Sequence, residues 1–280
     1  MDLGLKGKTV FVTGASGGIG LAVAEVLAQE GANLVLQGHR QFDALSSWVA
    51  EQDWSGRALP VQADVTDAAS VDAAFQMATD RFGPLHGCVV NAGVWPSEDT
   101  PLADMEEARL RRTLDVNLVG AVWTSRAFLR SIRSTGPSEK GIGASMVYTG
   151  STAAKFGEKG HCDYSASKAA LYGLMRSLKN EIVDIDPYGR VNVVDPGWTV
   201  TEMTEKNLDE PGVVERVVRT MPVKQLARAL DIANALVWLL SPAASRHVSG
   251  EIVTVAGGME GRVLWEAESV DVSAVKERLR

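Results

Sequence analysis

A tyrosine and a lysine four residues apart form the pair in this chain best suited to moving a proton. Tyr164 and Lys168 stand in the run Tyr-Ser-Ala-Ser-Lys, and this spacing on a helix puts both side chains on one face. A phenol with its ordinary pKa near ~10 is a poor base at neutral pH, but a nearby ammonium favours the phenolate. We therefore predict that Lys168 lowers the pKa of Tyr164, which exchanges a proton with an alcohol or a carbonyl oxygen.

That pair alone is a common surface arrangement, so the hypothesis needs partners. Ser151 follows a strand predicted over 145–149, and Asn117 lies on a helix predicted over 104–131. Side chains beyond the carboxyl ends of parallel strands converge on the ligand crevice of a doubly wound sheet. Taken singly, Ser151 is equally explained as a turn or helix-cap serine, and Asn117 as a buried amide bonded to its own helix.

A glycine cluster near the start of the chain has the composition of a phosphate-binding turn. The run Thr-Gly-Ala-Ser-Gly-Gly-Ile-Gly over 13–20 lies between an apolar strand-like run and a helix-like run. Glycines allow a tight turn there, and the amides at the start of a helix attract an anion. We expect this turn to bind the pyrophosphate of a dinucleotide through Gly14, Ser16, Gly18, Ile19 and Gly20.

The end of the second strand bears on the choice of dinucleotide. Sites that prefer NAD usually place an acid there for the adenosine ribose, but residues 37–40 are Gln-Gly-His-Arg. Arg40 can bind a 2′-phosphate through its planar guanidinium, so NADP(H) is favoured, with contacts from His39 and Arg40, and NAD(H) is the alternative. The competing interpretation is that Arg40 is only a solvated loop cation.

Asp64 and Val65 follow the third predicted strand and are expected to contact the adenine. The Asp64 carboxylate can cap the next helix, accept a hydrogen bond from the adenine amino group, or do both.

These residues are positioned by an alternation of strand-like and helix-like segments. The alternation predicts parallel strands joined by right-handed crossovers, hence an α/β, Rossmann-type doubly wound sheet in a single domain over 1–258. Strands are predicted over 8–13, 33–37, 58–63, 87–91, 145–149, 191–194 and 251–255, and helices over 21–29, 42–51, 68–82, 104–131 and 164–183.

Three segments fall outside this pattern. Residues 134–143 are rich in Gly, Pro and Ser and are predicted to form a surface loop. Residues 202–223 are predicted to form a mobile lid. The C-terminal tail, 259–280, does not fit the sheet, and it could cover the site, join an interface or be disordered.

Composition excludes several classes of protein. A chain of 280 residues with 45% hydrophobic residues can bury a large core, and a net charge of −7 gives no basic surface for nucleic acid or a membrane. The two cysteines form no CxxC pair, which fits a reducing compartment. The longest apolar run, 232–240, is too short to span a bilayer, and no signal peptide opens the chain. We predict a cytoplasmic protein, and the scattered histidines predict no metal site.

Six ordered motifs make residues 5–258 resemble the short-chain dehydrogenase/reductase family. The motifs are the turn over 13–20, Asn91-Ala92-Gly93, Asn117, Ser151, the pair Tyr164 and Lys168, and Pro196-Gly197. The resemblance implies that Ser151 hydrogen-bonds the substrate oxygen and that Tyr164 is the acid or base. It also implies that Lys168 holds the nicotinamide ribose and supports Tyr164, and that Asn117 anchors a proton-relay water. The implied cofactor contacts further include Asn91, Ala92, Gly93, Tyr164, Lys168, Pro196, Gly197, Thr199 and Thr201.

The resemblance implies an oxidoreductase that transfers a hydride between NAD(P)(H) and an alcohol or ketone. Trp95, Thr152, His161, Trp198 and Met203 flank the expected crevice, which slightly favours a polyol, a sugar or a small hydroxy-ketone. Each aromatic is also explained by packing, and His161 by a solvent-facing position. The resemblance further implies a homotetramer or homodimer formed through the long helices, with neither nucleic acid nor membrane as partner.

The sequence departs from the family pattern at three positions. Val90 replaces a polar residue common before Asn91, Thr199 stands where an apolar residue is usual, and Gly150 where a second serine is common. A catalytically idle dinucleotide-binding sensor or scaffold is the alternative function. An epimerase or dehydratase is disfavoured, because such relatives usually have a differently spaced glycine turn and a longer chain.

Overall fold

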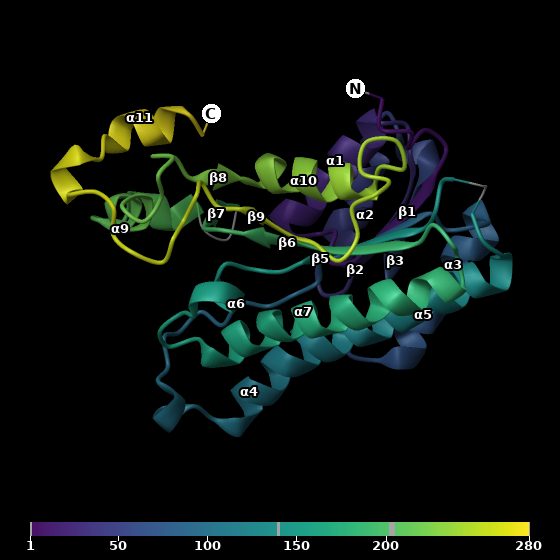
Figure 1. The fold of residues 1–280 in the computed structure, drawn as a ribbon, viewed down its shortest axis with the longest axis horizontal. Helices are drawn as coiled ribbons and strands as arrows, with labels where there is room; N and C mark the ends of the chain where they lie inside the picture. Colours follow the sequence, from purple (N-terminus) through teal and green to yellow (C-terminus); the bar gives the residue numbers. More distant parts are fainter. Residues whose placement is uncertain (1, 139–140, 202–204, 280) are drawn as a thin grey trace.

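Seven parallel strands form one sheet at the centre of the molecule (Figure 1). A computed structural model describes residues 2–138, 141–201 and 205–279, and the order in its main sheet is β3-β2-β1-β4-β5-β6-β9. The strands are β1 (Thr9–Val12), β2 (Asn33–Gly38), β3 (Ala58–Gln62), β4 (Gly87–Val90), β5 (Ser145–Thr149), β6 (Arg190–Pro196) and β9 (Ile252–Val255). The direction of strand order reverses between β1 and β4, where doubly wound sheets bind their ligands. The predicted α/β, Rossmann-type single domain is confirmed.

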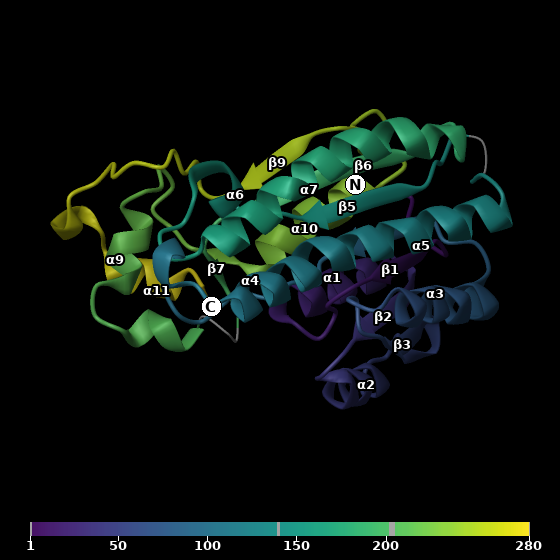
Figure 2. The same cartoon turned by 90° about the horizontal axis from the view of Figure 1, so that it is seen from below.

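Helices cover both faces of this sheet (Figures 1 and 2). One face carries α1 (Gly18–Gln29), α2 (Phe42–Ala50) and α10 (Ala229–Leu240), and the other carries α3 (Ala68–Phe82), α5 (Gly120–Thr135) and α7 (Cys162–Glu181). Alternate residues of a strand point to opposite faces, so Val10 packs under the first layer and Phe11 under the second. Because both faces are covered, the strands are almost continuously apolar.

The start of α3 corrects one sequence prediction. Asp67 is the residue that caps this helix, since its carboxylate accepts a hydrogen bond from the N–H of Ala69 at 2.9 Å. Asp64 accepts hydrogen bonds from the N–H and hydroxyl of Thr66, at 2.9 and 2.8 Å. The predicted capping role of Asp64 is therefore wrong, because its carboxylate closes a local turn at 64–66, before the helix begins at Ala68.

The helix predicted over 104–131 is interrupted. It begins later, as α4 (Glu107–Leu114), passes through a π-helical turn at Asp115–Val119, and continues as α5 to Thr135. A π turn adds a residue to one turn of helix and often marks a functional site. Here the turn contains Asn117, which is buried.

The C-terminal tail folds against the segment predicted to be a lid. Short strands β7 (Thr199–Val200) and β8 (Ala227–Arg228) pair in parallel, and α9 (Val213–Val218) lies between them in the chain. The tail helix α11 (Val272–Glu277) packs beside α9 (Figure 1). A small second core results, with Val214, Val218, Leu226, Val270 and Val275 buried. Residues 202–204, the start of the predicted lid, lie outside the described residues.

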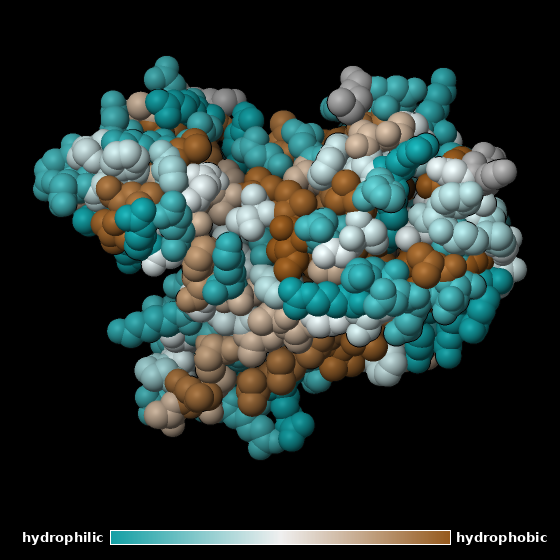
Figure 3. Space-filling model, in the orientation of Figure 1, coloured by the Kyte–Doolittle hydropathy of each residue, from teal (hydrophilic) through white to brown (hydrophobic). Residues whose placement is uncertain are grey.

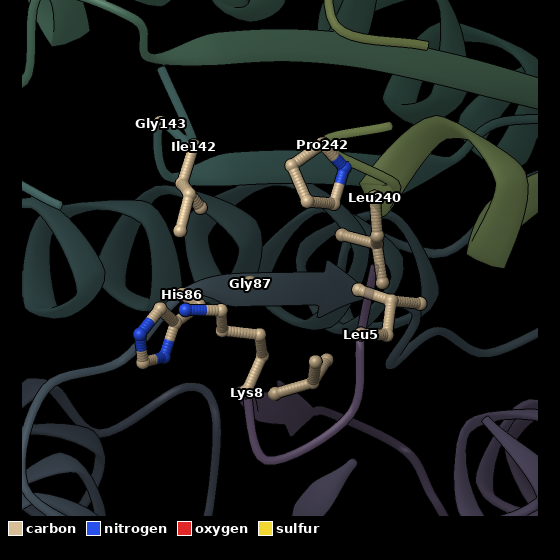
Figure 4. Close-up of a pocket in the computed structure, with 9 residues that line it drawn as sticks. Leu5, Lys8, His86, Gly87, Ile142, Gly143, Leu240 and Pro242 are labelled. Carbon is tan, nitrogen blue, oxygen red and sulfur yellow. The ribbon is translucent and has the colours of Figure 1, made fainter. Parts of the chain in front are cut away.

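The amino ends of β1 and β4 enclose a small, mainly apolar hollow (Figure 4). Leu5, Ile142, Leu240 and Pro242 supply apolar walls, and the ring of His86 accepts a hydrogen bond from the N–H of Thr9. This hollow lies at the opposite end of the sheet from the candidate site, so it contributes packing. Across the described residues, no helix has the length and apolar character needed to cross a membrane.

Candidate active site

The glycine turn links the end of β1 to the start of α1. Gly14 has a left-handed φ of +63°, and its N–H donates to the side-chain oxygen of Gln37 at 2.9 Å. A Cβ on Gly20 would lie 2.3 Å from the carbonyl oxygen of Gly14, so the backbone closes more tightly than any side chain permits. Helix α1 begins at Gly18, three residues before the predicted start, which brings Ile19 and Gly20 into its first turn with Ser16 just before it.

The end of β2 is organised by Gln37. This buried amide accepts from the N–H of Gly14 and donates to the carbonyl oxygen of Ala63 at 2.6 Å, so it stabilises the glycine turn. His39 and Arg40 are exposed beyond it, and the ring of His39 lies 3.8 Å from the Asp64 carboxylate. No carboxylate occurs from 37 to 40. Val65 is buried against Gly120, where a Cβ would lie 2.8 Å from its side chain.

Asn91 joins three neighbouring segments at the strand ends. Its side-chain N–H groups donate to the carbonyl oxygens of Thr13 and Gly14, and its oxygen accepts from the hydroxyl of Thr149 at 3.1 Å. The N–H of Ala92 donates to the Thr13 hydroxyl at 3.1 Å. Because these bonds occupy the Asn91 side chain, its predicted contact with a cofactor would involve its backbone.

Asn117 ties the end of β4 to α7. Its oxygen accepts from the N–H of Val94 at 2.7 Å, and its nitrogen donates to the Val94 carbonyl at 3.0 Å and to the Ser167 hydroxyl at 3.1 Å. These partners lie on other segments, so the alternative of an amide bonded to its own helix is wrong. A Cβ on Gly93 would lie 3.3 Å from both the Asn117 oxygen and Lys168 Nζ, which shows that the two side chains converge there.

Ser151, Tyr164 and Lys168 complete this group. Tyr164 shares a hydrogen bond with Ser151, whose hydroxyl also accepts from the N–H of Ala153 at 3.1 Å. Lys168 is buried, and its Nζ donates to the Thr149 carbonyl at 2.8 Å and lies 5.7 Å from the Tyr164 ring centroid. The four residues predicted to act together thus lie together at the carboxyl ends of β4 and β5.

The protonation of the pair differs from the sequence prediction. Burial raises the pKa of Tyr164 above its ordinary value, the hydrogen bond with Ser151 opposes this, and the charge of Asp195 adds to it. Burial lowers the pKa of Lys168 to about 8, with Asp195 acting in the opposite sense. The net direction is therefore opposite to the predicted lowering of the Tyr164 pKa, and desolvation is its largest cause.

An aromatic wall stands beside Tyr164. The Trp95 ring, 41% exposed, meets the Tyr164 ring edge-on with centroids 4.6 Å apart and stacks on His161 at 4.0 Å. His161 is buried, with Nε2 2.9 Å from the Pro96 carbonyl oxygen, so the solvent-facing interpretation is wrong. Figure 3 shows an indentation at this end of the molecule, between the lobe of α9 and α11 and the lobe of α4 and α6 (Ala153–Phe156).

The loop that follows β6 also borders the candidate site, next to the glycine turn. The Thr199 hydroxyl donates to the Gly197 carbonyl at 3.0 Å, next to Pro196, and a Cβ on Gly18 would lie 2.9 Å from the Thr201 side chain. Thr201 therefore touches the glycine turn. Met203 lies outside the described residues. Within 2–138, 141–201 and 205–279, no group of three or more His, Cys, Asp or Glu is placed to hold a metal ion.

Sequence reasoning missed two buried carboxylates that frame the site. Asp163, immediately before Tyr164, accepts from Arg109 at 3.1 Å and from the Thr113 hydroxyl at 2.9 Å, which anchors the start of α7 to α4. Asp195, on β6, accepts from the N–H of Ser151 at 3.1 Å. The available signal was an acid within the apolar run 191–196, since such a charge is rarely buried without partners.

Comparison with known proteins identifies the family. A family profile described as enoyl-(acyl carrier protein) reductase matches residues 14–260. The chain belongs to the short-chain dehydrogenase/reductase family. It is an NAD(P)-dependent oxidoreductase that acts on CH–OH and C=O groups.

Relatives of this chain act on different compounds. It is 34% identical to the acetoacetyl-CoA reductase of Synechocystis sp. over 92% of this chain and 98% of that protein. It is also 34% identical to the L-rhamnose 1-dehydrogenase (NAD(P)(+)) of Azotobacter vinelandii, over 90% and 96%. The crystal structure of a short-chain dehydrogenase/reductase SDR:Glucose/ribitol dehydrogenase from Brucella melitensis superposes with a TM-score of 0.82 at 32% identity, covering 93% and 99%.

Proposed function

We propose that this member of the family is an NADP(H)-dependent enzyme that interconverts an alcohol and a ketone, with Tyr164 as the acid or base. The observation that carries this proposal is the convergence of Asn117 and Lys168 on Gly93, with Tyr164 hydrogen-bonded to Ser151. Such a group of polar side chains at the carboxyl ends of parallel strands is built to hold a ligand and move one proton.

In this proposal, Ser151 orients the substrate and Tyr164 exchanges the proton. A bound nicotinamide supplies the donor or acceptor of the hydride. Ser151 fixes the substrate oxygen, and Tyr164 gives its hydroxyl proton to that oxygen as a carbonyl becomes an alcohol, or takes it back in reverse. The Tyr164 phenol is protonated at neutral pH, which is the form that donates a proton to a carbonyl oxygen. Asn117 anchors the water that returns the proton.

The dinucleotide would bind along the glycine turn and the carboxyl ends of the central strands. The backbone of Gly93 lies close to the Asn117 oxygen and Lys168 Nζ, and the nicotinamide ribose would bind beside this group, with its hydroxyls held by Lys168 and Tyr164. The pyrophosphate would contact Gly14, Ser16, Gly18, Ile19 and Gly20, and the adenine would lie near Asp64 and Val65. Further contacts would come from Asn91, Ala92, Gly93, Pro196, Gly197, Thr199 and Thr201.

NADP(H) is preferred to NAD(H) in this proposal. Gln37, the residue nearest to where an acid would bind the ribose, is used by Gly14 and Ala63. His39 and Arg40 are the exposed groups beyond it, and Arg40 offers a planar cation to a 2′-phosphate.

We further propose a small polyhydroxylated substrate, such as a sugar, a polyol or a hydroxy-ketone. Trp95 presents a partly exposed ring beside Tyr164, and the C–H face of a sugar packs well on such a ring. A short acyl thioester ketone is the competing substrate, because an acetoacetyl-CoA reductase is similar over nearly the whole chain.

A homotetramer or homodimer and a cytoplasmic location also remain proposals. On α7, Ala166 and Gly173 are exposed, and such small residues permit close approach of a second helix. Sedimentation that shows only a monomer would refute the proposed homotetramer or homodimer. The cytoplasmic location rests on the low cysteine content.

The experiment that tests the function is a two-way activity screen. NADP⁺ and NAD⁺ reduction would be followed with sugars, polyols and steroids, and NADPH and NADH oxidation with hydroxy-ketones and acetoacetyl-CoA. We expect turnover with NADP(H) and a polyhydroxylated compound. Tight cofactor binding without turnover on the whole panel would contradict the proposal and favour the sensor or scaffold.

A further inference from the structure

Asp195 is a buried carboxylate directly behind the candidate tetrad. It lies on β6, has no exposed surface, and each of its oxygens has a donor on a different element. One oxygen accepts from the N–H of Ser151 at 3.1 Å, and the other accepts from the Tyr172 hydroxyl on α7. Both oxygens act as acceptors, as in an ionised carboxylate. Burial raises the pKa of Asp195, and the hydrogen bonds from Tyr172 and Ser151 and the charge of Lys168 oppose this rise.

The neighbouring glycine shows that this position is built around the carboxylate. A Cβ on Gly150 would lie 2.0 Å from the nearer Asp195 oxygen and 2.8 Å from the Val193 side chain. The family's common second serine could not occupy position 150 without displacing Asp195. The glycine immediately before Ser151 and the acid on β6 are therefore two parts of one feature.

We propose that Asp195 is a positioning residue, which holds the main chain of Ser151 and supplies the fixed negative charge that balances Lys168. This inference rests on the proposed function, because it assigns Asp195 a role in the same proton exchange. Asp195 acts through the Ser151 main chain, from whose N–H it accepts a hydrogen bond, and through its charge, which favours the charged form of Lys168.

The charged and titratable groups around Asp195 set the sign of its effect. On α7, Tyr172 donates to Asp195, and Lys168 and Tyr164 are close enough for their pKa values to respond to its charge, with Arg176 acting on Tyr172. On α6, the charge of Lys155 acts on Asp195. Asp195 raises the pKa of both Tyr164 and Lys168, against burial for the lysine and with it for the tyrosine. Loss of the negative charge must therefore move both steps of the coupled Tyr164–Lys168 titration to lower pH.

Asp195→Asn separates charge from shape. The asparagine keeps an oxygen for the Ser151 N–H and loses the charge, so we expect kcat at the optimum within threefold of the unsubstituted enzyme. The pH profile of kcat/KM should move to lower pH by about one unit, as expected for loss of a close, buried charge. Asp195→Ala also removes the acceptor, so its kcat should fall roughly tenfold as well, because Ser151 loses its fixed position. Asp184→Asn, at an exposed acid beyond the end of α7, is the matched control and should leave the profile unchanged.

A direct titration makes the test independent of turnover. The pKa of Tyr164 would be measured by ultraviolet difference absorbance of the phenolate, with Tyr164→Phe subtracted, in the unsubstituted protein, Asp195→Asn and Asp195→Ser. We expect a lower Tyr164 pKa in each Asp195 variant that binds NADPH normally. Should Asp195→Asn fail to fold, the smaller serine still reports the loss of charge.

The outcomes distinguish this proposal from the proposed function. An unchanged Tyr164 pKa together with an unchanged pH profile in the Asp195 variants would overturn the positioning role, even in an enzyme that depends on Tyr164. Equal loss of kcat in Asp195→Asn and Asp195→Ala without a pH shift would also overturn it, since that pattern indicates a purely structural residue. Absence of turnover in the unsubstituted protein would contradict the proposed function, and the phenolate titration would still decide the role of Asp195.

Discussion

The glycine turn at 13–20 and the lid-and-tail unit, defined as 205–228 with 264–279, lie at the same end of the sheet but are held by different forces. In the turn, backbone atoms approach so closely that a Cβ on Gly20 would meet the Gly14 carbonyl oxygen at 2.3 Å. The lid-and-tail unit has its own small apolar core, which includes Val214, Val218 and Val275. The turn therefore offers fixed amides to a constant ligand, whereas the lid-and-tail unit can vary its side chains without disturbing the main core.

The largest effect should come from the crevice between these two regions. Tyr164→Phe removes the proton donor and leaves the glycine turn and the lid-and-tail unit untouched, so we expect kcat to fall about 10³–10⁴-fold. NADPH affinity, measured by fluorescence titration, should stay within threefold. Turnover within tenfold of the unsubstituted enzyme would refute the role of Tyr164.

The next effect tests the turn by comparing two of its glycines. Gly20→Ala should raise the Kd of NADPH by about 100-fold, or roughly 2.7 kcal/mol, because the backbone must open to admit the methyl group. Gly17→Ala is the matched control, since its Cβ would lie 3.6 Å from the nearest atom, an ordinary contact. Calorimetric titration of both variants checks this, and equal affinities would show that close backbone approach is not what binds the dinucleotide.

Arg40 tests whether the turn's neighbourhood also selects the cofactor. Arg40→Ala should weaken NADPH roughly 30-fold, as expected for loss of a charge-assisted contact, and NADH by less than threefold. Arg40→Lys should recover only part of the loss, since it lacks the planar fork. Equal weakening of NADPH and NADH would support the alternative that Arg40 is a solvated cation.

The smallest effect should come from the lid-and-tail unit. The Trp265 indole N–H donates to the Met221 carbonyl at 2.7 Å, and its ring lies under the Lys224 ammonium. We expect Trp265→Ala to raise the substrate KM about fivefold through looser packing of α9, with the Kd of NADPH unchanged. Hydrogen exchange over Val213–Val218 should become faster.

Val263→Ala, an exposed position two residues earlier, is the control for that variant and should change neither quantity. Altered NADPH affinity with an unchanged substrate KM in Trp265→Ala would show that the lid-and-tail unit and the glycine turn do not have separate functions.

The strands of the sheet and the helix that holds Tyr164 and Lys168 were predictable from the sequence. Buried parallel strands need apolar residues on both faces, so the runs over 33–37 and 145–149 were predicted close to their observed ends. The four-residue spacing of Tyr164 and Lys168 is a local property of a helix, and it holds on α7.

Features that depend on distant contacts were not predictable. The π turn at Asn117 is fixed by bonds to Val94 and Ser167, which are 23 and 50 residues away. Asp195 meets Ser151 only because β5 and β6 are neighbours in the sheet. The tail shows no strong periodicity of its own, and its burial depends on α9.

A crystal structure of the complex with NADP⁺ tests most directly whether the nicotinamide lies beside Tyr164. We expect the pyrophosphate on the glycine turn, and hydroxyls of the nicotinamide ribose within about 3.2 Å of Tyr164 Oη and Lys168 Nζ. A nicotinamide bound away from Tyr164, or a Tyr164 hydroxyl that faces out of the crevice, would contradict the role of Tyr164 as the acid or base.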